Sequence, residues 1–172
     1  GNLNSNLLLR ISISNSNTIY TDGSMIDGPG RVVGRVGFGV AALDINGSVT
    51  ALAYGVPPDW IDSVPGAEAW ALYEALRHSI PGVRIWSDCA SVVNRAKAGK
   101  EAATKAEIKT ARLWNMIYDI IGEATVDIHW LPAHTTKSQV GHILKGNGLP
   151  LTREDRSGND LADKLAKKGA KI

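Results

Sequence analysis

The sequence predicts an α/β protein with one mixed five-stranded sheet flanked by helices. Two observations lead to this fold class. Three strand-like segments come first with only a loop and a turn between them, and two further strand-like segments are separated by helical ones. Strands joined by tight turns pair antiparallel, whereas strands joined through helices pair in parallel. The order β-β-β-α-β-α-α-β-α therefore predicts three antiparallel strands and two parallel additions.

The individual elements follow from residue type and periodicity. Segments rich in β-branched and aromatic residues predict strands at 18–21, 32–43, 48–56, 83–88 and 126–131. Apolar residues at helical spacing predict helices at 66–79, from 89 to about 98, at 104–121 and at 158–170. In the first of these helices Glu74 is expected to face outward. Residues 135–157 show neither pattern and are expected to form a long irregular loop.

The composition limits the class of protein. A chain of 172 residues with 44% hydrophobic residues is long enough for one well-buried domain, which we place at 18–172 after an extension or linker at 1–17. No apolar run is long enough to span a bilayer. The single Cys89 excludes an internal disulfide and a Cys-rich zinc site, and favours a reducing, intracellular location. A net charge of +2 means that nucleic-acid binding would need local basic patches.

Two carboxylates are expected where predicted strands end. Asp22 follows the strand 18–21 and precedes Gly23, so taken alone it is typical of a turn residue. Asp88 ends the strand 83–88, and taken alone it would cap the next helix.

Two further acids lie on predicted helices. Glu68 is in line with the apolar stripe of its helix, although it could also complement the helix dipole in the first turn. In the last helix, Asp163 shares a face with small residues, whereas Asp160 shares one with lysines. We therefore expect Asp163 to be the inward-facing acid.

These four acids together suggest a metal site. Carboxylates brought together repel one another, so a cluster of them needs cations. Oxygen ligands without His or Cys suit Mg²⁺ or Mn²⁺. A carboxylate shared between two such ions is the arrangement used for in-line phosphodiester chemistry.

The chain resembles ribonuclease H of type 1, including the ribonuclease H domains of reverse-transcribing elements such as retrotransposons. The resemblance covers about residues 18–170, and its motifs occur in family order. They are Thr21-Asp22-Gly23-Ser24, Ala67-Glu68-Ala69-Trp70-Ala71-Leu72, Ser87-Asp88-Cys89, Trp130-Leu131-Pro132-Ala133-His134-Thr135 and Gly158-Asn159-Asp160-Leu161-Ala162-Asp163-Lys164-Leu165-Ala166.

The resemblance implies an endonuclease that hydrolyses the RNA strand of RNA–DNA hybrids with two Mg²⁺ ions, for which Mn²⁺ could substitute. Asp22 would bridge both ions, and Asp163 would complete the site that activates water. Glu68 and Asp88 would hold the ion near the leaving oxygen. His134 resembles the mobile histidine that assists proton transfer or product release.

Substrate recognition departs from the family pattern. The Asn or Gln residues that often touch the RNA strand are replaced here by Val64-Pro65-Gly66 and by Ala90. Within the matching motifs, Ser24 and Asn159 are expected nucleic-acid contacts. Lys97, Lys100 and Lys105 resemble a shortened basic protrusion that grips the hybrid, although a solvated helix face would look the same. The segment 135–157 is longer than in the family, and is either a substrate-touching flap or a tolerated insertion.

Two other classes remain as alternatives. One is a catalytically silent nucleic-acid-binding or scaffolding domain of the same fold, which would not need an intact acid set. The other is a DNA-cutting integrase or transposase, which the last two motifs disfavour. The resemblance further implies a domain that is monomeric in isolation, binds no membrane, and works beside other domains of a retroelement polyprotein.

Overall fold

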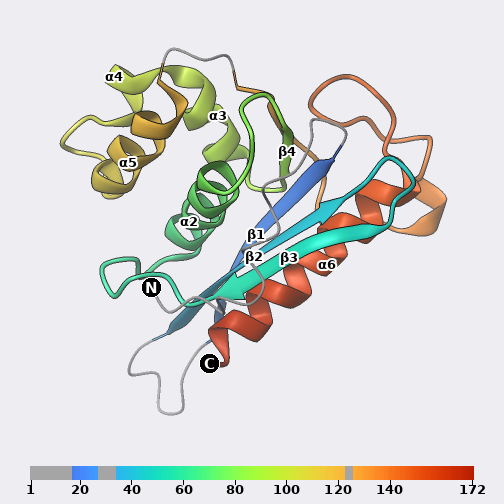
Figure 1. The fold of residues 1–172 in the computed structure, drawn as a ribbon, viewed down its shortest axis with the longest axis horizontal. Coiled ribbons are helices and arrows are strands. Elements are labelled where there is room, and N and C mark those ends of the chain that lie inside the picture. Colours follow the sequence, from blue (N-terminus) through green and yellow to red (C-terminus); the bar gives the residue numbers. More distant parts are fainter. Residues whose placement is uncertain (1–16, 27–33, 123–125) are drawn as a thin grey trace.

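The predicted mixed sheet is confirmed by a computed structural model that describes residues 17–26, 34–122 and 126–172 (Figure 1). The strand order is β3-β2-β1-β4-β5. The pairs β1–β2 and β2–β3 are antiparallel, and β1–β4 and β4–β5 are parallel. The strands are β1 (Thr18–Ile26), β2 (Arg35–Leu43), β3 (Val49–Gly55), β4 (Arg84–Ser87) and β5 (Ile128–Trp130).

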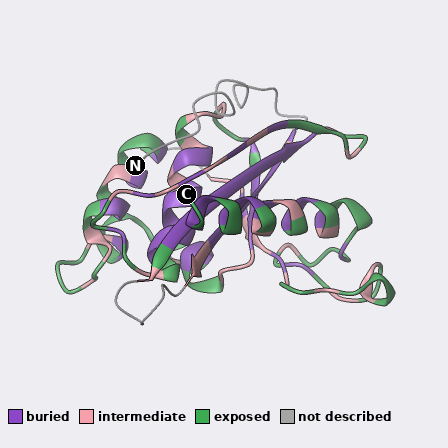
Figure 2. Cartoon of the chain, turned by 90° about the horizontal axis from the view of Figure 1, so that it is seen from below, coloured by how far each residue is buried: buried purple, intermediate pink, exposed green. Residues whose placement is uncertain are grey.

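Helices cover both faces of this sheet. The helices are α2 (Val64–Arg77), α3 (Ala90–Ala98), α4 (Lys100–Ala103), α5 (Ala111–Ile121) and α6 (Arg153–Ala170), with a 3-10 turn η2 (Lys137–Gln139). The helix α6 packs on β1, β2 and β3, while α2 packs on β1 and β2 and also contacts α5. Figure 2 shows helices that are buried toward the sheet and exposed outside. None of the helices in the described ranges is long and apolar enough to cross a membrane.

Each face of the sheet has its own apolar core. The larger core fills the space between the sheet and α2, α3 and α5, with Phe38, Leu72 and Trp114 fully buried. The smaller core lies on the α6 side and includes Trp86. There α6 runs directly over β2, where a Cβ at Gly39 would be 2.3 Å from the Ala162 carbonyl oxygen. The glycine is therefore required for this close approach.

The first strand differs from the prediction. It does not end at Thr21 but continues through Asp22 to Ile26, paired throughout with β2. Gly23 is thus a strand residue and not a turn residue. The pairing with β4 does end at Thr21↔Ser87, so one edge of β1 becomes free at Asp22.

Two helices begin five or more residues away from their predicted starts. The predicted helix 104–121 was wrong at its start, because residues 104–110 are not helical and α5 begins only at Ala111. The predicted start of the last helix at Gly158 was also wrong, because α6 begins at Arg153. Thr152 and Asp155 form a capping box there, and each side chain bonds the other residue's backbone nitrogen. The last part of the predicted loop 135–157 is therefore helical.

Glu74 was expected to face outward and is instead buried, with 2% of its surface exposed. Its carboxylate accepts a hydrogen bond from Arg77 at 3.0 Å, and His78 lies 3.5 Å away. The Arg77 guanidinium thus compensates the buried carboxylate. The prediction was wrong because it considered only the apolar residues of the helix and not this ion pair.

The segment between β5 and α6 is fastened to the rest of the fold. The Gly146 nitrogen donates to the Trp130 carbonyl at 2.7 Å. Lys145 is buried, pairs with Asp155 at 2.7 Å, and places its ammonium group 4.3 Å from the Trp86 ring centre. These contacts join the segment to β4, β5 and α6.

Candidate active site

Sheet register brings two of the predicted acids together. Thr21 of β1 is paired with Ser87 of β4 in the parallel ladder. Asp22 and Asp88 directly follow this last pair of the β1–β4 ladder. Both carboxylates therefore lie at the same end of these two strands and on the same face. Asp22 is buried, with 4% of its surface exposed, and Asp88 is half-buried.

A third acid comes from α2. Ser63 caps this helix by accepting a hydrogen bond from the Gly66 nitrogen at 3.1 Å, and Pro65 lies in the first turn, where a missing N–H costs nothing. Glu68 follows in the next turn and is 5% exposed. Its backbone lies against Gly23, where a Cβ would be 2.4 Å from the Glu68 nitrogen. Only glycine lets α2 approach the strand this closely.

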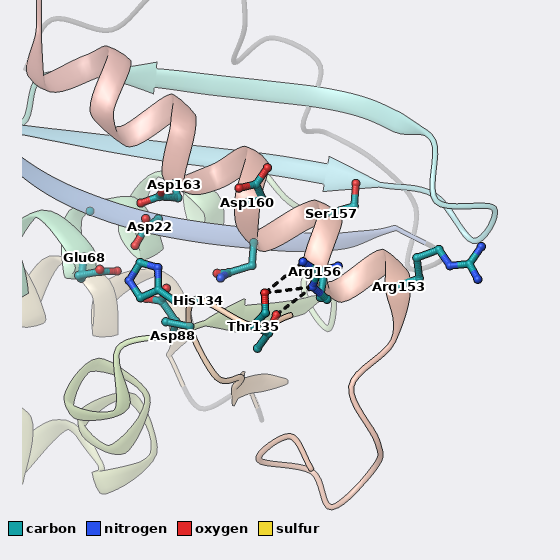
Figure 3. Close-up of a pocket in the computed structure, with 13 residues that line it drawn as sticks. Asp22, Glu68, Asp88, His134, Thr135, Arg153, Arg156, Ser157, Asp160 and Asp163 are labelled. Carbon is teal, nitrogen blue, oxygen red and sulfur yellow. Dashed lines mark hydrogen bonds between the residues drawn. The ribbon is translucent and has the colours of Figure 1, made fainter. Parts of the chain in front are cut away.

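Asp22, Glu68 and Asp88 form the centre of the site. One carboxylate oxygen from each lies within 4.8 Å of the others. These acids line one end of a cleft of about 510 Å³ (Figure 3). The rest of its wall is formed by Gly23, Ala133, His134, Thr135, Arg153, Arg156, Ser157, Asn159, Asp160 and Asp163.

Burial and mutual repulsion raise the pKa of each of these three acids. Removal from water is the largest cause for Asp22, followed by the charges of Glu68 and Asp88, and its pKa rises to about 11. Burial likewise raises the pKa of Glu68 to about 8, and that of Asp88 above its usual range. The protein alone thus disfavours three ionised carboxylates in this position.

The structure places Asp163 of α6 beside this group and Asp160 away from it (Figure 3). Partial burial opposes ionisation of Asp163, but hydrogen bonds with Lys167 and Asp22 outweigh it and lower the pKa. The Lys167 ammonium group lies 2.9 Å from the Asp163 carboxylate. Asp160 is exposed at the rim of the cleft and pairs with Lys164 at 2.8 Å.

His134 and Asn159 complete the acid end of the cleft. His134 is exposed on the loop after β5, and its imidazole points toward Asp88 and Asp22 (Figure 3). Asn159 is buried, and its side chain hydrogen-bonds the Asp88 carboxyl and lowers the pKa of that group, although burial keeps the pKa raised. The Asn159 amide oxygen has no hydrogen-bond partner among the described residues.

The other predicted nucleic-acid contacts lie outside the cleft. Ser24 is half-buried on β1, two residues beyond Asp22. Lys97 is exposed on α3, Lys100 is exposed on α4, and Lys105 is exposed in the turn that follows. The structure does not bring these lysines to the acid cluster.

The sequence analysis overlooked the other end of the cleft. Thr135, Arg153, Arg156 and Ser157 line it, and Arg156 hydrogen-bonds Thr135. The missed signal was the spacing Thr152-Arg153-Glu154-Asp155, which is a capping box. It would have predicted a helix from Arg153, and would have placed Arg156 one turn before the Asn159 motif.

The acid cluster fits a divalent cation. The Glu68 Oε2 atom is buried without a hydrogen-bond partner among the described residues. Such an atom is costly unless a ligand satisfies it. The site offers only carboxylate oxygens at close range, a donor set preferred by hard cations such as Mg²⁺ and Mn²⁺. A bound cation would also offset the burial and the repulsion that raise the three pKa values.

Comparison with known proteins agrees with this geometry. The family model described as RNase H matches residues 14–171. The chain is 29% identical over 159 residues to a ribonuclease H of Pseudomonas paraeruginosa and to ribonuclease HI of Pseudomonas aeruginosa. Each alignment covers 88% of this chain and 90% of the relative. The chain therefore belongs to the ribonuclease H family, and it is a type 1 enzyme of that family.

Solved structures share the fold at lower sequence identity. The solution structure of the PFV RNase H domain has a TM-score of 0.66 at 21% identity, covering 91% of this chain and 94% of that domain. LC9-RNase H1, a type 1 RNase H with the type 2 active-site motif, has a TM-score of 0.62 at 17% identity, covering 90% of this chain and 72% of that one. LC11-RNase H1 in complex with RNA/DNA hybrid has a TM-score of 0.55 at 17% identity, covering 88% and 97%.

Proposed function

We propose that this ribonuclease H is an endonuclease that hydrolyses the RNA strand of RNA–DNA hybrids with two Mg²⁺ ions. The observation that carries the proposal is the convergence of Asp22, Glu68 and Asp88 at the end of an open cleft, with Asp163 beside them. Relatives of this fold were solved with RNA/DNA hybrid, which supports the choice of substrate.

In this proposal the four acids hold the metal. Asp22 lies between the other carboxylates and would be shared by both ions. Glu68 and Asp88 would hold the ion on the leaving-group side, and Asp163 would complete the other site. When bound, Mg²⁺ supplies Lewis-acid stabilisation of the phosphate and a nucleophilic water, and Mn²⁺ could replace it.

The remaining residues would orient groups and carry protons. His134 is exposed at the mouth of the acid end and faces Asp88, so it could take or give a proton at its imidazole during turnover or product release. Asn159 would fix the orientation of the Asp88 carboxylate. The expected products carry a 5′-phosphate and a 3′-hydroxyl.

Substrate grip would come from outside the acid cluster. Lys97, Lys100 and Lys105 are exposed and free to contact backbone phosphates, and Ser24 and Asn159 would contact the hybrid near the cut. Binding through phosphates would weaken as salt is added.

We further propose that residues 18–172 form one ribonuclease H domain, that 1–17 is an extension, and that the domain serves a reverse-transcribing element. The likeness to foamy viral protease–reverse transcriptase supports that context.

A cleavage assay with three substrates tests the proposal. An end-labelled RNA–DNA hybrid, an RNA duplex and a DNA duplex are incubated with Mg²⁺ or with chelator. We expect internal cleavage of the RNA strand of the hybrid in Mg²⁺ alone. Tight hybrid binding without cleavage at any Mg²⁺ or Mn²⁺ concentration would favour the silent binding domain. Cleavage of duplex DNA would favour the integrase class.

A further inference from the structure

The backbone of His134 is held in an unusual conformation. Its φ is +51°, and it is the one non-glycine residue with positive φ in the described ranges. The left-handed region costs a side-chain-bearing residue about 1–2 kcal/mol. Such a conformation persists only where its surroundings hold it, and it is found most often at functional sites.

Arg156 holds the residue next to His134 in place. Its Nε atom donates to the Thr135 carbonyl at 3.3 Å and to the Thr135 hydroxyl at 3.2 Å, and Nη2 donates to the same carbonyl at 3.1 Å (Figure 3). Within the described residues, residues 132–135 make no other hydrogen bond. The planar guanidinium therefore fixes Thr135, the residue that directly follows His134, through its carbonyl and its hydroxyl.

The helix that carries Arg156 is itself firmly anchored. Asp155 bonds the backbone nitrogen of Thr152, accepts a hydrogen bond from the Tyr20 hydroxyl at 2.7 Å, and pairs with buried Lys145. Tyr20 lies on β1, two residues before Asp22. β1 therefore positions Asp22 and, through the bond between Tyr20 and Asp155, also the start of α6 that carries Arg156.

We propose that Arg156 is a positioning residue that keeps the His134 imidazole over the acid cluster. The inference rests on the proposed function, because it assigns His134 a part in hybrid cleavage. Arg156 acts through the loop and does not serve as a phosphate ligand, since Nε and Nη2 already bond Thr135.

Steady-state kinetics on the RNA–DNA hybrid separate these roles. Arg156→Gln is expected to lower kcat by about tenfold or more while KM changes less than about twofold, because a misplaced group slows the chemical step. Arg153→Gln is the matched control, since it removes the same charge from the same cleft wall without breaking a hydrogen bond between described residues. It should leave kcat within about twofold. Arg156→Lys, which keeps the charge but not the planar fork, should remain as slow as Arg156→Gln.

A double-mutant cycle tests whether Arg156 acts through His134. In a His134→Ala background, Arg156→Gln should cause no further loss of kcat. Independent, multiplicative losses would overturn the proposal. A raised KM with unchanged kcat, or full rescue by Arg156→Lys, would also overturn it, because either result is expected of a phosphate contact.

A structural readout completes the test without depending on activity. Hydrogen exchange of the 131–141 peptide in metal-free protein should be faster in Arg156→Gln than in wild type or Arg153→Gln. Unchanged exchange would contradict the anchor. If wild type fails to cleave the hybrid, the proposed function fails, whereas the exchange result still supports or overturns the anchor separately.

Discussion

Gly23 lies directly against the backbone of Glu68, and a Cβ at this glycine would be 2.4 Å from the Glu68 nitrogen. The contact joins β1 to α2 at the residue next to Asp22, and it sets how closely Glu68 approaches that acid. The spacing of the acid cluster therefore depends on a position that contributes no side chain.

Gly23→Ala should be strongly destabilising. The new methyl group would overlap backbone atoms, which cannot rotate away, so α2 must shift at a cost of about 1–3 kcal/mol of unfolding free energy. Urea unfolding measures this. Gly34→Ala is the control, because its Cβ would meet the flexible Met25 side chain instead. Equal stability of the two variants would contradict this account of the β1–α2 contact.

The acid cluster should make the metal-free protein less stable as pH rises. Burial raises the pKa of Asp22, Glu68 and Asp88, whereas the unfolded carboxyls titrate near their usual values of about 4. Above about pH 4 the unfolded state binds fewer protons at these groups than the folded state, so folding stability falls as pH rises through the folded pKa values. Melting temperatures in chelator, measured from about pH 5 to about pH 8, should decrease.

Asp22→Asn provides the control for that pH dependence. It removes the carboxyl whose pKa is raised most, and with it the free-energy cost of keeping that buried acid protonated while the unfolded chain ionises it. In chelator the variant should therefore melt above wild type at about pH 8, and its melting temperature should depend less on pH. Adding Mg²⁺ should stabilise wild type more at the higher pH, because binding needs deprotonated ligands. If wild type in chelator becomes more stable with pH and Asp22→Asn does not differ, the repulsion argument is wrong.

Asp163 and Asp160 form a matched pair on α6. Asp163 lies beside Asp22, whereas Asp160 is an exposed rim residue paired with Lys164. Asp163→Asn should lower hybrid cleavage by more than about 100-fold through lost metal affinity, since even residues that only support a metal ligand cost up to that much. Asp160→Asn should change the rate by less than about twofold, because exposed pairs contribute little. Cleavage rates at one Mg²⁺ concentration below saturation decide between them, and the reverse order would show that the wrong acid was chosen.

Lys145 should be essential for folding stability. Its ammonium group pairs with buried Asp155, so Lys145→Met leaves a buried carboxylate without its cation at a cost of about 3–5 kcal/mol. Lys164→Met breaks an exposed pair on the same helix and should not measurably change the urea midpoint. Equal midpoints for the two variants would show that Lys145 does not stabilise the fold.

The order of elements and the pairing of the sheet were predictable from sequence. Short turns and helical crossovers determine which strands pair antiparallel and which in parallel, and that pattern is local. The inward choice of Asp163 over Asp160 also followed from its small neighbours on the helix surface. The local pattern of turns, helices and apolar residues was therefore sufficient to predict the strand pairing and the face of Asp163.

The remainder depended on contacts between distant residues. Gly23 resembled a turn residue because only its packing against α2 shows why glycine is needed there. Glu74 was predicted to be exposed because the pattern of apolar residues does not show that Arg77 pairs with its carboxylate. The role of Arg156 in holding Thr135 requires that the ends of a long segment meet in space, which no local pattern reports.

The most direct test compares RNA-strand cleavage by wild type and Asp22→Asn on the same labelled hybrid in Mg²⁺. The four-acid account predicts internal cuts by wild type that yield 5′-phosphate ends, no cuts in chelator, and loss of activity in Asp22→Asn despite a fold at least as stable. Hybrid cleavage by Asp22→Asn at the wild-type rate would contradict the assignment of Asp22 as the shared metal ligand.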